Sequence, residues 1–328
     1  MTAPLTKKQL LNQLLHAADE GGWNALIASG AHPYLLRVFR DDDRSFNLRV
    51  YIWNCTHGGH SRADDEFRIQ VTIPTLEARP GETTLLLGWH SGYGVFVGFD
   101  ITKHAGAVAA SPSIQVREDA LASAHRHSFA VHLRNNGEIA VAFRPEFLVD
   151  YALNAKALHA TGTVDQDVNL LNTLDSVTDA DVNAVINKDR KSVISQIVRR
   201  YRAHDFRNRV LSAYGYRCAA CGVQLELIDA AHIIPVAEPS STDETQNGVA
   251  FCKLHHAAFD RNLISFDPQY RIEVSDRQVG RLADANLIGG LRQFQRHLRD
   301  AIILPADHRD YPNPDYIKQS RVVRQWGA

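Results

Sequence analysis

The stretch that decides the fold covers residues 217–267 and reads RCAACGVQLELIDAAHIIPVAEPSSTDETQNGVAFCKLHHAAFDRNLISFD. It holds two pairs of metal-ligating residue types, and two residues separate the members of each pair. Cys218 and Cys221 form the first pair, and Cys252 and His255 form the second. Three thiolates and one imidazole suit a closed, tetrahedral Zn²⁺ site. We therefore predict a structural zinc, which a small, loop-rich module needs in order to fold.

Three further residues stand in a fixed order around these pairs: His232, Asn247 and His256. Together with the flanking runs FRNRVLSAYGYRCAACG and NGVAFCKLHHAAFDRNLISFD, they resemble the HNH modules of bacterial restriction endonucleases. The resemblance covers roughly Phe206 to Pro268, under a quarter of the chain. It implies a ββα-metal fold and a nuclease that hydrolyses phosphodiester bonds in DNA.

The resemblance also assigns roles to the three residues. His232 would be the general base at the end of the first strand of a hairpin, since a neutral imidazole can take a proton from water near pH 7. Asn247 would brace the loop and orient His232 through its amide. His256 would be a ligand of the catalytic divalent cation, Mg²⁺ or Mn²⁺, which stabilises the developing charge.

One position departs from the family pattern. Many members have an acidic residue or a second histidine before the base, as another metal ligand, but this chain has Ala231 there. Asp229 lies three residues before His232, and Asp260 lies four residues after His256, on the same helix face. Either carboxylate would complete the cation site, or serve in a cap or an ion pair. Adjacent helical residues point about 100° apart, so only one of the two neighbouring histidines should face the zinc.

A basic segment precedes this module. Residues 188–217 hold nine Lys or Arg and two Asp, although the net charge of the whole chain is −1. Beside a nuclease, such a surface is expected to contact DNA phosphates; a solvated helix face is the alternative. The residues expected to bind DNA are Arg199, Arg200, Arg202, Arg207 and Arg209.

The N-terminal part is different in pattern. After a helical stretch, short apolar runs such as LRVYIW, TTLLLGW and YGVFVGF alternate with turn residues, which indicates a mixed sheet or a small barrel. Trp53, Trp89 and Tyr93 are candidates for a pocket that stacks a flipped base. The alternative is that these aromatic side chains belong to the core. By analogy with modification-dependent restriction endonucleases, we expect this part to read a DNA base.

The composition agrees with two domains. The chain has 328 residues, and a typical domain has about 150, so the length predicts two domains. We expect an α+β protein: a mixed-sheet recognition domain at 1–150, a connecting segment at 151–190 and a zinc-stabilised HNH domain at 191–328. No apolar run is long enough to span a membrane, and four cysteines are too few for a disulfide framework. We therefore expect a cytoplasmic protein.

The function that follows is restriction of foreign, including methylated, double-stranded DNA. Cutting two strands with one active site per chain suggests a homodimer. Two alternatives stay open. One is a defence effector nuclease that a second messenger activates through the N-terminal part. The other is a DNA-binding protein with a degenerate nuclease site, which Ala231 would favour.

Overall fold

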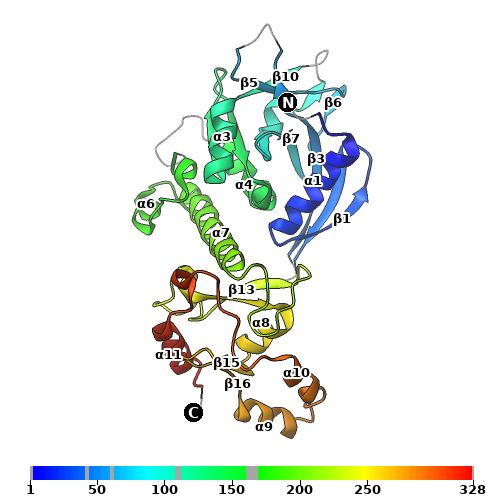
Figure 1. The fold of residues 1–328 in the computed structure, drawn as a ribbon. Coiled ribbons are helices and arrows are strands. Elements are labelled where there is room, and N and C mark those ends of the chain that lie inside the picture. The colour runs from blue at the N-terminus through cyan, green and yellow to red at the C-terminus, as the bar shows by residue number, and fades with distance from the viewer. Residues whose placement is uncertain (1–2, 41–43, 60–62, 108–111, 160–168, 327–328) are drawn as a thin grey trace. The chain divides into compact units, whose positions relative to one another are not determined.

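The computed structural model divides the chain into two compact units, Met1–Tyr201 (unit 1) and Arg202–Ala328 (unit 2). Each unit is described by itself. The residues that the structure describes are 3–40, 44–59, 63–107, 112–159 and 169–326. Figure 1 shows the elements of both units.

Unit 1 is built on a seven-stranded sheet in the order β1-β2-β3-β7-β8-β12-β11. Strands β3 and β7 run parallel, and every other neighbouring pair runs antiparallel. The strands are β1 (Asn24–Ser29), β2 (Tyr34–Phe39), β3 (Ser45–Asn54), β7 (Thr83–His90), β8 (Val95–Phe99), β11 (Phe129–Leu133) and β12 (Ile139–Phe143).

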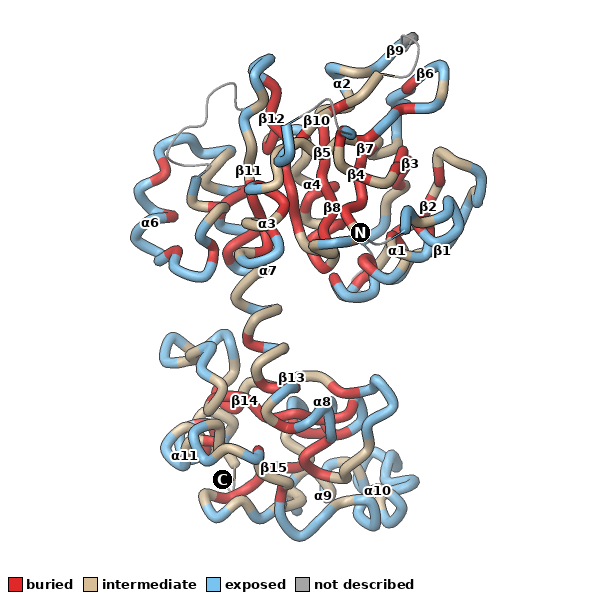
Figure 2. The backbone as a smooth tube through the Cα atoms, turned by 45° about the horizontal axis from the view of Figure 1, so that its top comes forward, coloured by how far each residue is buried: buried red, intermediate tan, exposed pale blue. Residues whose placement is uncertain are grey.

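The central strands are buried on both faces (Figure 2). Along β3, Val50 and Ile52 enter one core, whereas Tyr51 and Trp53 enter the other. This alternation explains why these strands read as unbroken apolar runs in the sequence. The first core lies under α1 (Lys7–Glu20), α4 (Leu148–His159) and the N-terminal part of α7 (Lys188–Ala213).

The opposite face of the sheet carries α3 (Glu118–His127) and a second sheet in the order β10-β5-β4. That sheet comprises β4 (Thr56–His57), β5 (Glu66–Gln70) and β10 (Ser113–Arg117). The smaller elements of unit 1 are α2 (Ile101–His104), α6 (Asp179–Ala184), the pair β6 (Thr75–Leu76) and β9 (Gly106–Ala107), and the 3₁₀ turns η1 (Pro145–Phe147) and η2 (Leu170–Thr173).

The segment expected to connect the domains, 151–190, differs from a linker where the structure describes it. Residues 160–168 lie outside the described residues. Tyr151, Leu171 and Val182 are buried in the first core of unit 1, and the division between the units falls after Tyr201. The apolar residues of this segment are interspersed with Asn, Thr and Asp, which hides its buried face in the sequence. The limits of the functional domains stay a prediction.

Unit 2 contains the expected hairpin and helix. Strands β13 (Ile228–His232) and β14 (Gly248–Cys252) pair antiparallel, and α8 (Lys253–Asp260) follows at once. A second hairpin, β15 (Ile264–Phe266) and β16 (Ile272–Val274), precedes the other helices. These are α9 (Asp276–Asp284), α10 (Leu291–His297) and α11 (Pro314–Val323). The 3₁₀ turn η3 (Thr245–Asn247) lies just before β14, and η4 (His308–Asp310) lies between α10 and α11.

The predicted fold class is confirmed: a mixed, β-rich N-terminal part precedes a ββα unit with a Cys3His cluster that could bind zinc. Among the described residues, no helix is both long enough and apolar enough to cross a membrane.

Candidate active site and metal centre

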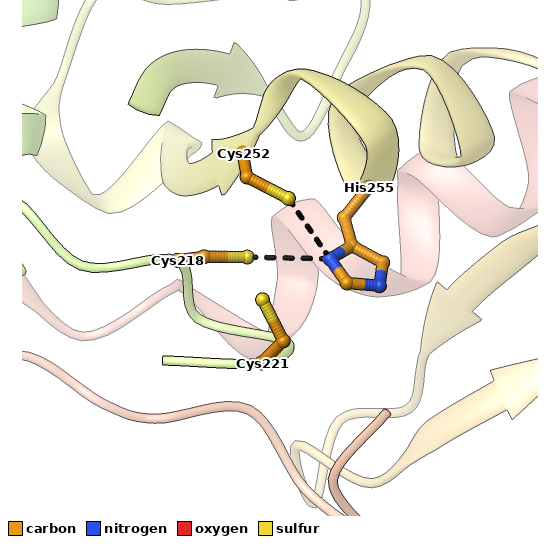
Figure 3. A group of neighbouring side chains, drawn as sticks. All are labelled: Cys218, Cys221, Cys252 and His255. Carbon is orange, nitrogen blue, oxygen red and sulfur yellow. Dashed lines mark hydrogen bonds between the residues drawn. The ribbon is translucent and has the colours of Figure 1, made fainter. Parts of the chain in front are cut away.

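The four predicted zinc ligands converge on one point (Figure 3). Cys218 and Cys221 lie in the turn before β13, Cys252 ends β14, and His255 lies in the first turn of α8. Their ligand atoms all lie within 4.8 Å of one another. The Nδ1 atom of His255 is 3.1 Å from Sγ of Cys252 and 3.5 Å from Sγ of Cys218.

These distances fit a tetrahedral metal. Bond lengths of zinc to sulfur and nitrogen imply a ligand–ligand distance of about 3.6 Å. Burial lowers the pKa of His255, which keeps its imidazole neutral and able to bind a metal. Burial raises the pKa of the three thiols, so they stay protonated unless a metal ion takes the place of their protons. His255 is buried and its ring packs against Phe294, at 5.4 Å between centroids. His256 is not part of the cluster.

The hairpin brings the candidate base close to α7. In the β13–β14 register, His232 lies opposite Gly248. A Cβ atom at Gly248 would lie 2.2 Å from Val210 and 3.0 Å from Phe206 of α7, so no side chain fits there. This close approach lets the Phe206 ring stack on His232, at 3.8 Å between centroids and 16° between planes.

His232 has a second, polar partner. Its Nε2 atom is 3.0 Å from Oδ1 of Asp243, in the loop between the two strands. This hydrogen bond holds the pKa of Asp243 below its usual value, so the carboxyl is ionised at neutral pH and acts as the acceptor. With the carboxylate as acceptor, the tautomer of the imidazole that fits this contact has its proton on Nε2, which leaves the lone pair on Nδ1 for a proton transfer.

Asn247 closes the loop that carries Asp243. Its fully buried side chain accepts a hydrogen bond from the backbone N–H of Ile234 at 2.9 Å and donates to the carbonyl oxygen of Thr242 at 2.8 Å. Among the described residues its amide makes no hydrogen bond to His232. Asn247 therefore acts on His232 through the loop, by fixing the residue next to Asp243.

The two candidate carboxylates have different surroundings. On α8, Oδ2 of Asp260 is 3.4 Å from Nε2 of His256. Asp229 instead lies 2.7 Å from the Lys253 ammonium and 3.0 Å from Arg207. Burial opposes its ionisation, but the hydrogen bond and charge of Lys253, with Arg207, hold the pKa of Asp229 below its usual value. The structure thus brings Asp260, rather than Asp229, together with His256.

Several of the five arginines expected to bind DNA have partners within the protein. In unit 1, Arg200 pairs with Asp150 at 3.3 Å and donates to the carbonyl oxygen of Gly21, whereas Arg199 is exposed. Arg200 therefore ties α7 to the core of unit 1.

In unit 2, the basic residues of α7 hold the candidate site together. Arg207 binds Asp229, and Arg209 donates to the carbonyl oxygen of Asp243 at 2.7 Å. The charge of Arg202 also lowers the pKa of Asp243. The excess of Lys and Arg in the sequence pointed to this helix as a DNA contact. In the structure, Arg207 and Arg209 instead form hydrogen bonds with the β13–β14 hairpin and its loop.

The three aromatic residues proposed for a base pocket do not come together. Trp53 belongs to the core on one face of the sheet, and Trp89 belongs to the core on the other. Tyr93 is partly buried and its hydroxyl donates to Glu118 at 2.8 Å. In the pairing of β3 with β7, Trp89 lies beside Asn54 and not beside Trp53. The two tryptophan side chains therefore point to opposite faces of the sheet.

Sequence reasoning missed Asp243 and Phe206 as partners of His232. Asp243 lies in the run SSTDETQ, which has no periodic pattern, and Phe206 reads as an ordinary apolar position of a helix. The only available signal was an acidic residue close before Asn247.

The zinc assignment predicts a loss of folding when one ligand is removed. Replacing Cys252→Ser should reduce the zinc content, measured by elemental analysis, from one per chain toward zero. It should also unfold unit 2, because structural zinc contributes roughly 10 kcal/mol or more in small modules. The matched control is Cys55→Ala, which removes a buried thiol in unit 1 and should leave the zinc content unchanged. A Cys252→Ser protein with full zinc would contradict the assignment.

Two family models match parts of the chain. Residues 218–267 match the HNH endonuclease family, and residues 46–152 match the family described as methylase-associated X1. Among solved structures, a modification-dependent TagI restriction endonuclease is similar at 11% identity with a TM-score of 0.29, over 84% of this chain and 80% of that chain. No match was found among curated proteins. By the HNH match and the ββα unit that carries it, the chain contains an HNH endonuclease domain and is a nuclease of that class, a DNA-cleaving hydrolase.

Proposed function

We propose that the protein is a metal-dependent restriction endonuclease that hydrolyses phosphodiester bonds in foreign double-stranded DNA, with His232 as its general base. The observation that carries this proposal is the environment of His232. Its ring stacks on Phe206, and its Nε2 atom is bonded to Asp243. These two contacts fix both the orientation of the imidazole and its tautomer.

The reaction follows from that arrangement. Nδ1 of His232 takes a proton from a water molecule as the water oxygen attacks the phosphorus atom. As the new P–O bond forms, the P–O bond to one strand end breaks, and the oxygen that leaves takes up a proton from solvent. The carboxylate of Asp243 then stabilises the imidazolium that forms, since the second ring proton is already directed at it. Asn247 holds the loop still, so no reorganisation is needed during the reaction.

The pair His256 and Asp260 would hold the catalytic Mg²⁺ or Mn²⁺. One imidazole and one carboxylate on adjacent turns of α8, 3.4 Å apart, suit such a cation, with water and substrate oxygens as its other ligands. When bound, it would stabilise the negative charge that develops on the phosphate. The Cys3His cluster would hold Zn²⁺ and has no open position for chemistry.

We further propose that unit 1 recognises the DNA and favours a modified base. The support is the match of residues 46–152 to a family described as methylase-associated. Each chain has one such candidate site, so a homodimer would be needed to cut both strands at once. A protein that restricts incoming DNA would act in the cytoplasm.

A cleavage assay tests this proposal. Purified protein with Mg²⁺ or Mn²⁺ is given two matched plasmids, one unmodified and one with methylated adenine or cytosine. We expect the methylated plasmid to be cut, and we expect His232→Ala to cut at least about 100-fold more slowly because the general base is lost. A zinc-loaded, folded protein that cuts neither plasmid would contradict the proposal.

The two carboxylates give a second test of the site. Asp260→Asn should lower the cleavage rate by about tenfold or more at limiting Mg²⁺, because a cation ligand is weakened. Asp229→Asn should leave the rate within about threefold. Equal losses of rate in the two variants would contradict the assignment of Asp260.

Asp229 should act on stability instead. Its pKa is lowered in the folded protein, so its contribution is present above the unfolded value near 4 and is lost as the pH falls through the folded value. Asp229→Asn should therefore lower the free energy of unfolding by about 1 kcal/mol at pH 7. The difference from the wild type should shrink below about pH 4, which denaturant titrations at several pH values would measure.

A further inference from the structure

A cavity of about 230 Å³ lies in unit 1 and has no part in the site described so far. Its walls come from β5, from β10, and from the end of β11 with the turn that follows it (Figure 2). β10 is an edge of the three-stranded sheet, and β11 is an edge of the seven-stranded sheet. The cavity therefore lies where edges of these two sheets come together. Pockets for drug-sized ligands have roughly 300–1,000 Å³, so this cavity suits one smaller group.

The cationic side chains of the cavity are paired with carboxylates. Nη1 of Arg117 lies 2.5 Å from Oδ1 of Asp65. Arg134 forms an ion pair with Glu138, whose side chain is only 2% exposed. The wall also contains the carboxylate of Glu66. An anion would meet neutralised arginines and a further negative group, so the charges disfavour a phosphate as the ligand.

Three other polar side chains of the wall make no hydrogen bond within the part of the chain that the structure describes. They are Gln115 on β10, His132 on β11 and Asn135 in the turn after β11. Each amide supplies N–H donors and an acceptor oxygen, and a neutral imidazole supplies one donor and one acceptor. The unused groups of the cavity therefore offer donors and acceptors together.

His132 is a partly buried member of this set. It follows Ala130 by two residues along β11, and Ala130 is buried in the core on the α3 face of the sheet, so both side chains point to that face. Burial lowers the pKa of His132, although the charge of Asp119 opposes this effect, so the ring is neutral at pH 7. A flat, uncharged ring with two unused nitrogens suits stacking and hydrogen bonding to a flat, uncharged ligand.

A nucleobase is a ligand of this kind. It is flat, its polar edge presents donors beside acceptors, and its faces stack on planar side chains. A base that has left the duplex is held in protein pockets by these two kinds of contact, along its edge and on its face. The mixed donors and acceptors of the cavity thus match a base better than they match an anion.

The cavity also lies in the part of unit 1 for which DNA recognition is proposed. Its lining residues fall between Glu66 and Asn136, within the range 46–152 that matches the family described as methylase-associated X1. The aromatic residues that the sequence suggested for a base pocket, Trp53, Trp89 and Tyr93, are not among them.

We propose that this cavity binds a single nucleobase by its polar edge, with Gln115, His132 and Asn135 as the contacts that select the base. The inference rests on the proposed recognition of DNA by unit 1, because it takes the ligand to be a base that has left the stack of a duplex. The same chemistry would fit the base of a free nucleotide, and the test distinguishes these two sources.

The test compares duplexes that differ in one base outside the stack. Fluorescence anisotropy gives the affinity of the full-length His232→Ala protein for labelled 20-bp duplexes. One duplex is fully paired, and the others carry one extrahelical A, C, G, T, 5-methylcytosine or N6-methyladenine. An extrahelical base has already lost its pairing, so binding does not have to extrude it. We expect at least one of these duplexes to bind about tenfold or more tightly than the paired duplex.

Two variants in that background test the contacts. His132→Ala and Gln115→Ala should each reduce the preference for the extrahelical base by about fivefold, because a hydrogen bond made only to that base is lost. Binding of the fully paired duplex should stay within about twofold.

The matched control is His127→Ala. This histidine of α3 is 31% exposed, lies 3.4 Å from Asp175 and does not line the cavity. It should keep the preference of the parent. If His132→Ala and Gln115→Ala keep the preference as His127→Ala does, the proposal is overturned.

Calorimetric titration with the corresponding nucleoside monophosphates identifies the source of the base. Binding of a nucleotide that His132→Ala loses, without any preference among the duplexes, would support the cavity and assign it to free nucleotides. A parent that neither prefers an extrahelical base nor binds a nucleotide would overturn the proposal.

Plasmid cleavage by proteins that retain His232 separates this proposal from the proposed function. A preference that depends on His132, without cleavage by the parent, would support the cavity and reject the nuclease proposal. Cleavage by the parent, with neither a preference nor nucleotide binding, would reject the cavity alone.

Discussion

The Cys3His cluster is the constraint on which unit 2 depends. It joins the turn before β13 to the end of β14 and the start of α8. The same turn carries further links: Ala219 donates to Ala250 at 2.7 Å and accepts from Ile303 at 2.8 Å, and Arg299 donates to Ala220 at 3.0 Å. A metal at this point would therefore order the hairpin, the helix and the segment around residues 299–303 together.

The far end of the hairpin has a different kind of support. There the loop between β13 and β14 is closed by the buried amide of Asn247, and Arg209 of α7 binds the backbone of the loop at Asp243. Both contacts fix the carboxylate that orients His232. The end of the hairpin that carries His232 is thus held by hydrogen bonds, whereas the Cys3His cluster lies at its other end.

The spacing of the Cys and His residues predicted the cluster, and the resemblance to HNH modules predicted the ββα unit. The sequence did not predict Asp243, since loop residues follow no period. It left an ion pair open for Asp229, but did not show that the partner would be Lys253 at the start of α8. In unit 1 the strands were recognisable, but the pairing of β3 with β7 places Trp53 and Trp89 on opposite faces. Because no turn joins β3 to β7, the sequence offered no turn geometry from which to read their register.

The central claim is that the imidazole of His232 accepts the proton of the attacking water. Chemical rescue tests it most directly. In His232→Gly, the ring of Phe206 and the carboxylate of Asp243 would still border the space that the side chain leaves. We predict that the variant is inactive on DNA and that added imidazole restores cleavage in proportion to its neutral form. A folded, zinc-loaded variant that cleaves DNA without imidazole at the wild-type rate would contradict the claim.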